Sequence, residues 1–133
     1  MVPPARLPAA PLPAAPLAAA TPRLRIRIVF DEARFFGPGK ADLLAGIARA
    51  GSIAAAGRDM GMSYKRAWDL VQAMNAMFAV PLVAMARGGA NGGGTALTAE
   101  GEQVLALYHQ VQDAALGAGG VALQELTAKL NDI

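Results

Sequence analysis

The sequence contains no cysteine, few aromatic residues and no long unbroken apolar run. Without cysteine, disulfides and thiolate metal sites are excluded, and the composition is compatible with the reducing cytoplasm, where we expect the protein. Aromatic residues make up 5% of the chain although apolar residues make up 54%, so we expect a core of Leu, Ile, Val and Met with close helix contacts over Ala. No apolar run approaches the roughly 20 residues of a membrane helix, and no membrane partner is predicted.

The net charge is also small, +2 over 133 residues, but it is unevenly distributed. Residues 23–95 carry ten Lys/Arg and five Asp/Glu, whereas residues 96–133 carry Lys129 and five acidic residues. A basic body with an acidic segment suits a protein that faces a polyanion with one side. Chance clustering of solvated charges explains the same numbers, and charge alone does not separate the two interpretations.

Proline is concentrated at the start of the chain, where residues 1–22 hold seven of the nine. This density forbids a continuous helix or strand ladder, and it interrupts every apolar stretch that a secretory signal needs. We therefore predict a disordered Pro/Ala-rich tail over 1–22, a folded domain over 23–116 and a helical extension over 117–133.

The folded part shows two periodicities. Leu24, Ile26 and Ile28 alternate with arginines, which predicts a half-buried strand over 23–30. Later segments have helical spacing, with glycine or serine where helices end and begin. The expected elements after a break at 35–39 are helices over 40–50, 53–60 and 64–78, strands over 82–87 and 95–97, a fourth helix from Thr98 to about 116, an interruption at Gly117–Gly120 and a short helix over 121–130.

The segment from Gly51 to Phe78 has the pattern of a helix-turn-helix. Small residues (Ala55, Ala56, Gly57) stand where a second helix would cross, and Gly61 suits a turn that needs positive φ. The second helix would start with the cationic run Ser63-Tyr64-Lys65-Arg66, at the end that enters a major groove in this motif. An ordinary αα-hairpin with a solvated basic face is the competing interpretation.

A glycine-rich loop over 88–94 between the two expected strands is typical of the wing of a winged helix. It lacks the strand-loop-helix context and the Lys-Ser/Thr ending of a P-loop. Trp68 suits core or rim packing better than base stacking, and His109, without a second histidine or cysteine nearby, suits a surface or interface position better than a metal site. No nucleophile, base and orienting acid come together, so no enzyme, catalytic residue, metal or cofactor is predicted.

These motifs resemble the N-terminal DNA-binding domain of the ModE-type molybdate-responsive regulators, from about Arg23 to Val111. The helix-turn-helix part is also similar to that of LysR-type regulators. The residues that carry the resemblance are Gly51-Ser52-Ile53, Gly61-Met62-Ser63-Tyr64-Lys65-Arg66-Ala67-Trp68, the loop over 88–94, Leu97-Thr98 and Gly101.

The resemblance implies an α+β winged helix-turn-helix with an N-terminal strand, a two-stranded Gly-rich wing and a long C-terminal helix. It implies a homodimer that binds a palindromic operator in double-stranded DNA and regulates genes of molybdate transport or molybdenum enzymes. The predicted DNA contacts are Ser52, Ser63, Tyr64, Lys65, Arg66, Arg87, Asn91 and Thr95.

Two departures bear on this expectation. The residues after the fourth helix are too few for the family's molybdate-binding region, so direct molybdate sensing is not expected, and a separate molybdate-sensing protein is a partner that the resemblance leaves open. Ala90-Asn91 also stands where the family's wing usually has a lysine, although Arg87 can compensate. The alternative function is a winged-helix adaptor that contacts proteins without sequence-specific DNA binding.

Overall fold

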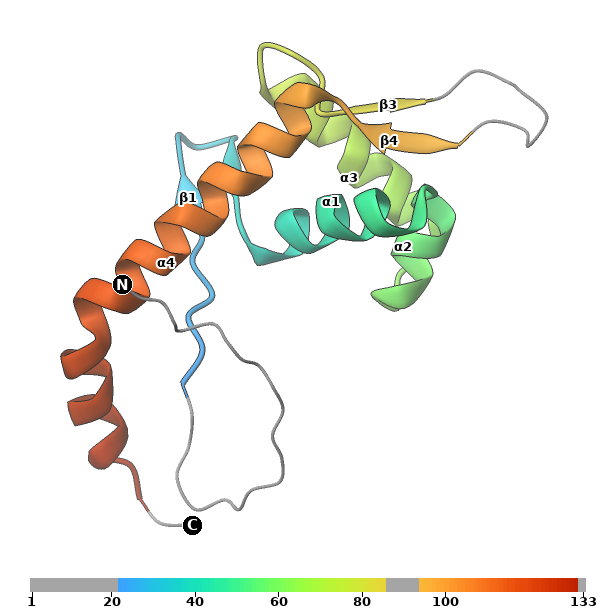
Figure 1. Cartoon of the computed structure of the whole chain (residues 1–133). Coiled ribbons are helices and arrows are strands. Elements are labelled where there is room, and N and C mark those ends of the chain that lie inside the picture. Colours follow the sequence, from blue (N-terminus) through green and yellow to red (C-terminus); the bar gives the residue numbers. More distant parts are fainter. Residues whose placement is uncertain (1–21, 86–93, 132–133) are drawn as a thin grey trace. The chain divides into compact units, whose positions relative to one another are not determined.

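The computed structural model describes residues 22–85 and 94–131 (Figure 1). Residues 25–110 form one compact unit, and the described residues outside it belong to a second unit. No helix in the described ranges is both long and apolar enough to cross a membrane. The elements are β1 (Ile28–Val29), β2 (Phe35–Phe36), α1 (Pro38–Ala50), α2 (Ile53–Asp59), α3 (Tyr64–Met77), β3 (Val83–Met85), β4 (Thr95–Leu97) and α4 (Ala99–Ala128).

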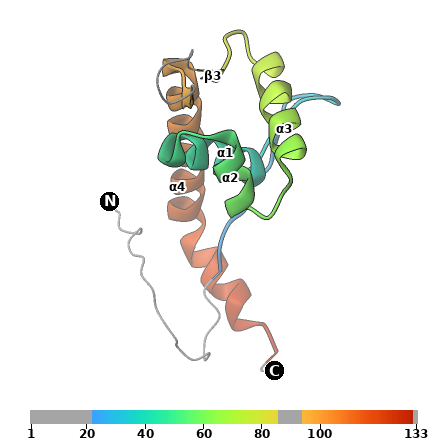
Figure 2. The ribbon, with the colours of Figure 1, turned by 90° about the vertical axis from the view of Figure 1, so that its right-hand side faces the viewer.

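The three central helices follow the local signals of the sequence. Gly51 ends α1 in the left-handed region at φ 70°, and its N–H donates to the carbonyl of Ile47. The Ser52 hydroxyl accepts from the Ala55 N–H and so caps α2. α1 packs on α2 and α2 on α3, and both views show the three helices as neighbours (Figures 1 and 2). The predicted helices are confirmed, although α1 begins two residues earlier because Pro38 suits the first turn of a helix.

The N-terminal strand is much shorter than predicted. β1 comprises Ile28 and Val29 alone, paired antiparallel with Phe36 and Phe35. β2 lies where the sequence predicted only a break. Because β2 is two residues long, only two residues of β1 can pair with it. The predicted alternation persists outside the ladder, since Ile26 is partly buried and both Arg25 and Arg27 are exposed.

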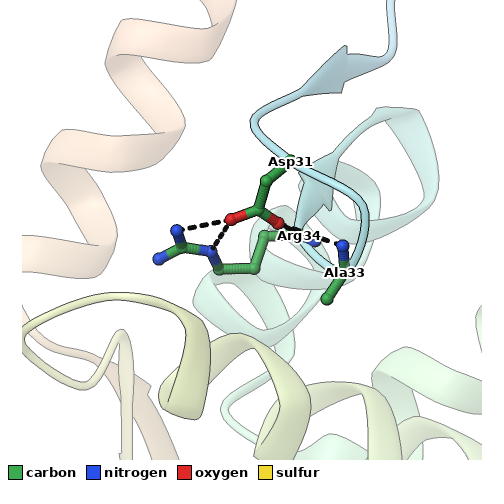
Figure 3. Close-up of polar contacts among 3 residues, drawn as sticks. All are labelled: Asp31, Ala33 and Arg34. Carbon is green, nitrogen blue, oxygen red and sulfur yellow. Dashed lines mark hydrogen bonds and ion pairs between the residues drawn. The ribbon is translucent and has the colours of Figure 1, made fainter.

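The turn between β1 and β2 is held by the carboxylate of Asp31 (Figure 3). It accepts hydrogen bonds from the N–H groups of Ala33 and Arg34 at 3.0 and 2.8 Å. It also accepts from Nε of Arg34 at 2.8 Å and pairs with the Arg34 guanidinium. The hydrogen bond from the Arg34 side chain is the main reason why the pKa of Asp31 lies below its ordinary value.

The second sheet is the base of the predicted wing. β3 and β4 are antiparallel, with Val83 opposite Leu97, Ala84 opposite Ala96 and Met85 opposite Thr95. Residues 86–93, which include most of the glycine loop, lie outside the described part of the chain. The mixed helical and two-stranded architecture confirms the predicted α+β class.

The predicted interruption of the fourth helix is wrong. α4 continues from Ala99 through Gly117–Gly120 to Ala128. A glycine inside a helix costs about 1 kcal/mol relative to alanine and does not by itself end the helix, and good helix formers surround these glycines. The start of α4 is as expected, because the Thr98 hydroxyl accepts from the Gly101 N–H at 3.0 Å and acidic residues occupy the first turn.

The core is aliphatic, as the composition predicts, with two aromatic additions. Phe36 and Tyr108 are 2% and 4% exposed, and their rings meet edge to face with centroids 5.2 Å apart. The phenol of Tyr108 donates to the carbonyl of Ile26 at 2.5 Å, which joins α4 to the chain just before β1. The aliphatic side chains with the least exposure are Leu43, Leu44 and Ile47 from α1, Val71 and Met74 from α3, and Leu82 before β3.

Candidate nucleic-acid interface

The amino end of α3 is shaped by two residues that the sequence singled out. Gly61 lies in the turn after α2 at φ 73°, a backbone conformation that costs a residue with a Cβ about 1–2 kcal/mol. Ser63 is the N-cap, and its hydroxyl oxygen accepts from the Arg66 N–H at 3.1 Å. Because that bond uses the Ser63 oxygen as acceptor, its hydroxyl hydrogen stays available to donate, for example to a phosphate.

The crossing of α2 and α3 is close because small residues meet there. A Cβ added to Gly57 would lie 2.9 Å from the Cβ of Ala67, which is closer than real Cβ atoms approach. Ala67 is completely buried, and Met60 and Met62 pack against the core from either side of the turn. The angle at which α3 leaves the body is therefore set by these side chains, as the helix-turn-helix pattern predicts.

The side chains at the start of α3 are exposed. Tyr64 is 54% exposed and Trp68, one helical turn later, is 38% exposed. Of the two packing roles predicted for Trp68, core or rim, its exposure fits the rim. Lys65 and Arg66 are also exposed, so this end of α3 presents two cations and two aromatic groups to solvent.

One carboxylate lies among these cations. Nζ of Lys65 contacts the Asp69 carboxylate at 2.9 Å, with side chains 83% and 55% exposed. An exposed i,i+4 pair of this kind contributes only about 0.3–0.5 kcal/mol, so it yields readily to a stronger anionic partner. Arg66, by contrast, forms no ion pair within the described ranges.

The root of the wing is joined by hydrogen bonds to the connection between α1 and α2 and to the segment that follows α3. The Thr95 N–H donates to the carbonyl of Gly51 at 3.0 Å. Thr95 in β4 therefore lies close to Ser52, which follows Gly51 and caps α2. The Thr98 hydroxyl donates to the carbonyl of Pro81 at 2.7 Å. Of the predicted DNA contacts, Arg87 and Asn91 lie outside the described residues, while Ser63, Tyr64, Lys65 and Arg66 are brought together on α3.

Sequence reasoning missed Asn75, which fixes the connection from α3 to the wing. Its side-chain oxygen accepts from the N–H groups of Leu82 and Val83 at 2.8 and 3.1 Å. Its side-chain nitrogen donates to the carbonyl of Val83 at 3.0 Å. A polar residue in the last turn of a helix is a weak signal for such a clamp, because its partners follow seven and eight residues later.

Sequence reasoning also missed Lys40, which is only 9% exposed although it is charged. Its Nζ lies 3.4 Å from the centre of the Phe35 ring, and the guanidinium carbon of Arg27 lies 3.8 Å from the same centre. Burial, together with the charge of Arg27, lowers the pKa of Lys40. No sequence pattern indicated that Lys40 would be buried against Phe35, since a lysine near the start of a helix is ordinarily solvated.

Comparison with known proteins shows a family to which the helical part of the chain is similar. Residues 40–102 match the family model described as bacterial regulatory helix-turn-helix protein, lysR family. This range runs from the first turn of α1 to the first turn of α4 and includes α2, α3, β3 and β4. This part of the chain is therefore similar to the helix-turn-helix region of bacterial regulatory proteins.

Individual relatives narrow the class further. The chain is 51% identical over 76 residues to the molybdenum-pterin-binding protein MopB of Rhodobacter capsulatus, covering 57% of this chain and 28% of MopB. It is 43% identical over 83 residues to the transcriptional regulator ModE of Haemophilus influenzae, covering 62% of this chain and 32% of ModE. It is 43% identical over 74 residues to the DNA-binding transcriptional dual regulator ModE of Escherichia coli K12, covering 56% and 28%.

The resemblance to the ModE-type regulators is thus confirmed as homology, which covers 56–62% of this chain in these three comparisons. The chain spans less than a third of the length of MopB and of these ModE relatives. The relatives are regulators or binding proteins by name.

Proposed function

We propose that this chain is a DNA-binding transcriptional regulator of the ModE type, acting on genes of molybdate transport or molybdenum enzymes, with no catalytic role of its own. The observation that carries the proposal is the amino end of α3, which is capped by Ser63, exposed and cationic. A helix start of this kind offers backbone N–H groups and a positive dipole end to an anion. The cytoplasm is the compartment in which such a protein meets its DNA.

In this proposal α3 enters the major groove with Tyr64, Lys65 and Arg66 toward the bases and phosphates. Arg66 can donate in bidentate fashion to a guanine edge or to a phosphate. Lys65 exchanges its weak pair with Asp69 for a phosphate. Ser52 and Thr95, which lie together at the root of the wing, contact the backbone beside the groove, and Arg87 and Asn91 extend the contact from the wing.

We further propose that the regulator is a homodimer. Several large apolar side chains of α4 are exposed, among them Leu107 at 49%, Val111 at 45% and Val121 at 71%. Exposed apolar groups gathered on one element usually mark an interface. Tyr108 of the same helix is instead buried in the chain's own core. A dimer would present two α3 helices to half-sites about 34 Å apart.

The test is fluorescence anisotropy with promoter DNA and random DNA at several salt concentrations. Arg66→Ala is expected to weaken binding to the promoter DNA and to lower the slope of log K against log salt by about one unit. Lys129→Ala removes the same charge near the end of α4 and is expected to leave both quantities unchanged. An unchanged slope in Arg66→Ala would remove Arg66 from the contact, and equal weak binding of both DNAs by the wild type would favour the adaptor function.

A further inference from the structure

A cleft of about 220 Å³ opens between the start of α1 and α3, beside the amino end of α3 that we propose reads DNA (the reading end). Three cationic side chains, Arg27, Lys40 and Arg66, line it, and no carboxylate from residues 22–85 or 94–131 does. The remaining wall is aromatic and aliphatic, with Phe35, Met62 and Leu70 among its residues. A concentration of positive charge in a partly apolar hollow is costly unless an anion offsets it.

Lys40 is the most unusual of the three cations. It is only 9% exposed, yet its ammonium forms no hydrogen bond or ion pair to another of the described residues and rests on the Phe35 ring at 3.4 Å. Arg27 shares that ring at 3.8 Å, so two like charges face one aromatic group. No buried side-chain nitrogen of the described residues lacks a hydrogen-bond partner, so the Lys40 ammonium keeps contact with the solvent of the cleft, where an anion can pair with it.

The start of α1 adds a second, independent source of positive potential. α1 is 13 residues long, its N-cap is Gly37, which has no side chain to cap with, and its first turn contains no acidic residue. By helix geometry the N–H groups of Gly39 and Lys40 have no carbonyl acceptor within the helix. Gly37, Pro38 and Gly39 all line the cleft, so these donors and the positive end of the helix dipole lie at its wall.

We propose that this cleft binds a tetrahedral oxyanion of the phosphate class, held by Lys40, Arg27 and the first N–H groups of α1, with Arg66 closing the site from α3. Several acceptor oxygens on one small centre match donors that converge from different sides, and a guanidinium can bind two of them at once. The oxyanion is either a phosphodiester of the DNA backbone, in which case the inference rests on the proposed function, or a free inorganic anion.

The first experiment uses inorganic phosphate and does not involve DNA. The amide signals of Gly39 and Lys40 are followed by NMR while phosphate replaces chloride at constant ionic strength. We expect saturable shifts in the wild type, at least a tenfold weaker affinity in Lys40→Met and in Arg27→Gln, and wild-type affinity in Lys129→Met. Arg27 is exposed, so its variant keeps the test valid if Lys40→Met alters the fold.

Shifts that rise linearly with phosphate, or equal affinity in the wild type and in both cleft variants, would overturn the proposal.

The second experiment identifies the source of the oxyanion. If a DNA phosphate occupies the cleft, Lys40→Met lowers the salt slope of DNA binding by about one unit and bound DNA abolishes the phosphate response. If the ligand is a free anion, the slope is unchanged and phosphate still binds the complex. A chain that binds phosphate but no DNA would refute the regulator and keep the cleft.

Discussion

Replacing Asn75 with alanine removes three hydrogen bonds between α3 and the first residues of the wing. The N–H groups of Leu82 and Val83 lose their acceptor, and the carbonyl of Val83 loses its donor. A net hydrogen bond contributes about 1 kcal/mol, and a buried donor left without a partner costs about 1–3 kcal/mol. Because these groups are only partly buried, we count about 1 kcal/mol for each of the three bonds and expect Asn75→Ala to lower the free energy of unfolding by about 3 kcal/mol.

Asn75→Asp separates the three contributions. The carboxylate keeps an oxygen for the Leu82 and Val83 N–H groups but cannot donate to the Val83 carbonyl, and it sets a negative charge near the carboxyl end of α3. We expect a loss of about 1–2 kcal/mol, between the wild type and the alanine variant. Gln72→Ala, at an exposed position of the same helix, is the control and is expected to change the stability by no more than about 0.5 kcal/mol.

The assay is urea unfolding at neutral pH, combined with hydrogen exchange of the Leu82 and Val83 amides. Exchange of both amides is expected to accelerate in Asn75→Ala more than in Asn75→Asp, because only the alanine variant leaves them without an acceptor. If Asn75→Ala unfolds at the same urea concentration as Gln72→Ala and its two amides stay protected, the side chain does not hold the wing, and the reasoning fails.

Two further predictions concern packing and pH. Gly57→Ala would place a Cβ 2.9 Å from that of Ala67 and is expected to lower the unfolding free energy by about 1–3 kcal/mol. Gly119→Ala in α4, with no atom within 4 Å of the new Cβ, is expected to increase helicity by circular dichroism. Similar effects of both changes on the melting temperature would contradict the close crossing of α2 and α3. Tyr108→Phe loses the bond to Ile26, worth about 1 kcal/mol. Because burial, assisted by Asp42, raises the pKa of Tyr108 above the ordinary 10.0, the wild type binds the phenolic proton more tightly when folded and loses stability as the pH rises from 10.0 through the folded pKa. The stability difference between wild type and variant should therefore shrink from pH 8 to pH 11 in urea unfolding, and a constant difference would count against a buried phenol.

The parts of the fold that were predicted correctly depend on neighbours in sequence. Ser52 and Ser63 cap helices through the N–H three residues later, and Gly51 and Gly61 take the positive φ that the turns require. These contacts are complete within a few residues, so residue type and spacing are enough to anticipate them. The reading end of α3 is built in this way, which is why most of the candidate interface could be predicted.

The parts that were missed depend on residues far apart or on small energy differences. β2 and the short length of β1 follow from pairing with each other, and the Tyr108 bond to Ile26 spans 82 positions. Lys40 becomes buried only because Phe35 and α3 come together around it. The glycines at 117–120 lower helix propensity without preventing the helix. The division into a tail, a domain over 23–116 and an extension stays a prediction.

The most direct test of the account is selection of binding sites from random double-stranded DNA by the purified chain. We predict enrichment of one two-fold symmetric sequence with half-sites about one helical turn apart, and loss of that enrichment when Lys65 and Arg66 are both replaced by alanine. Recovery of unenriched DNA by the folded wild-type chain, or the same enriched sequence from the double variant, would contradict the claim that the amino end of α3 reads DNA.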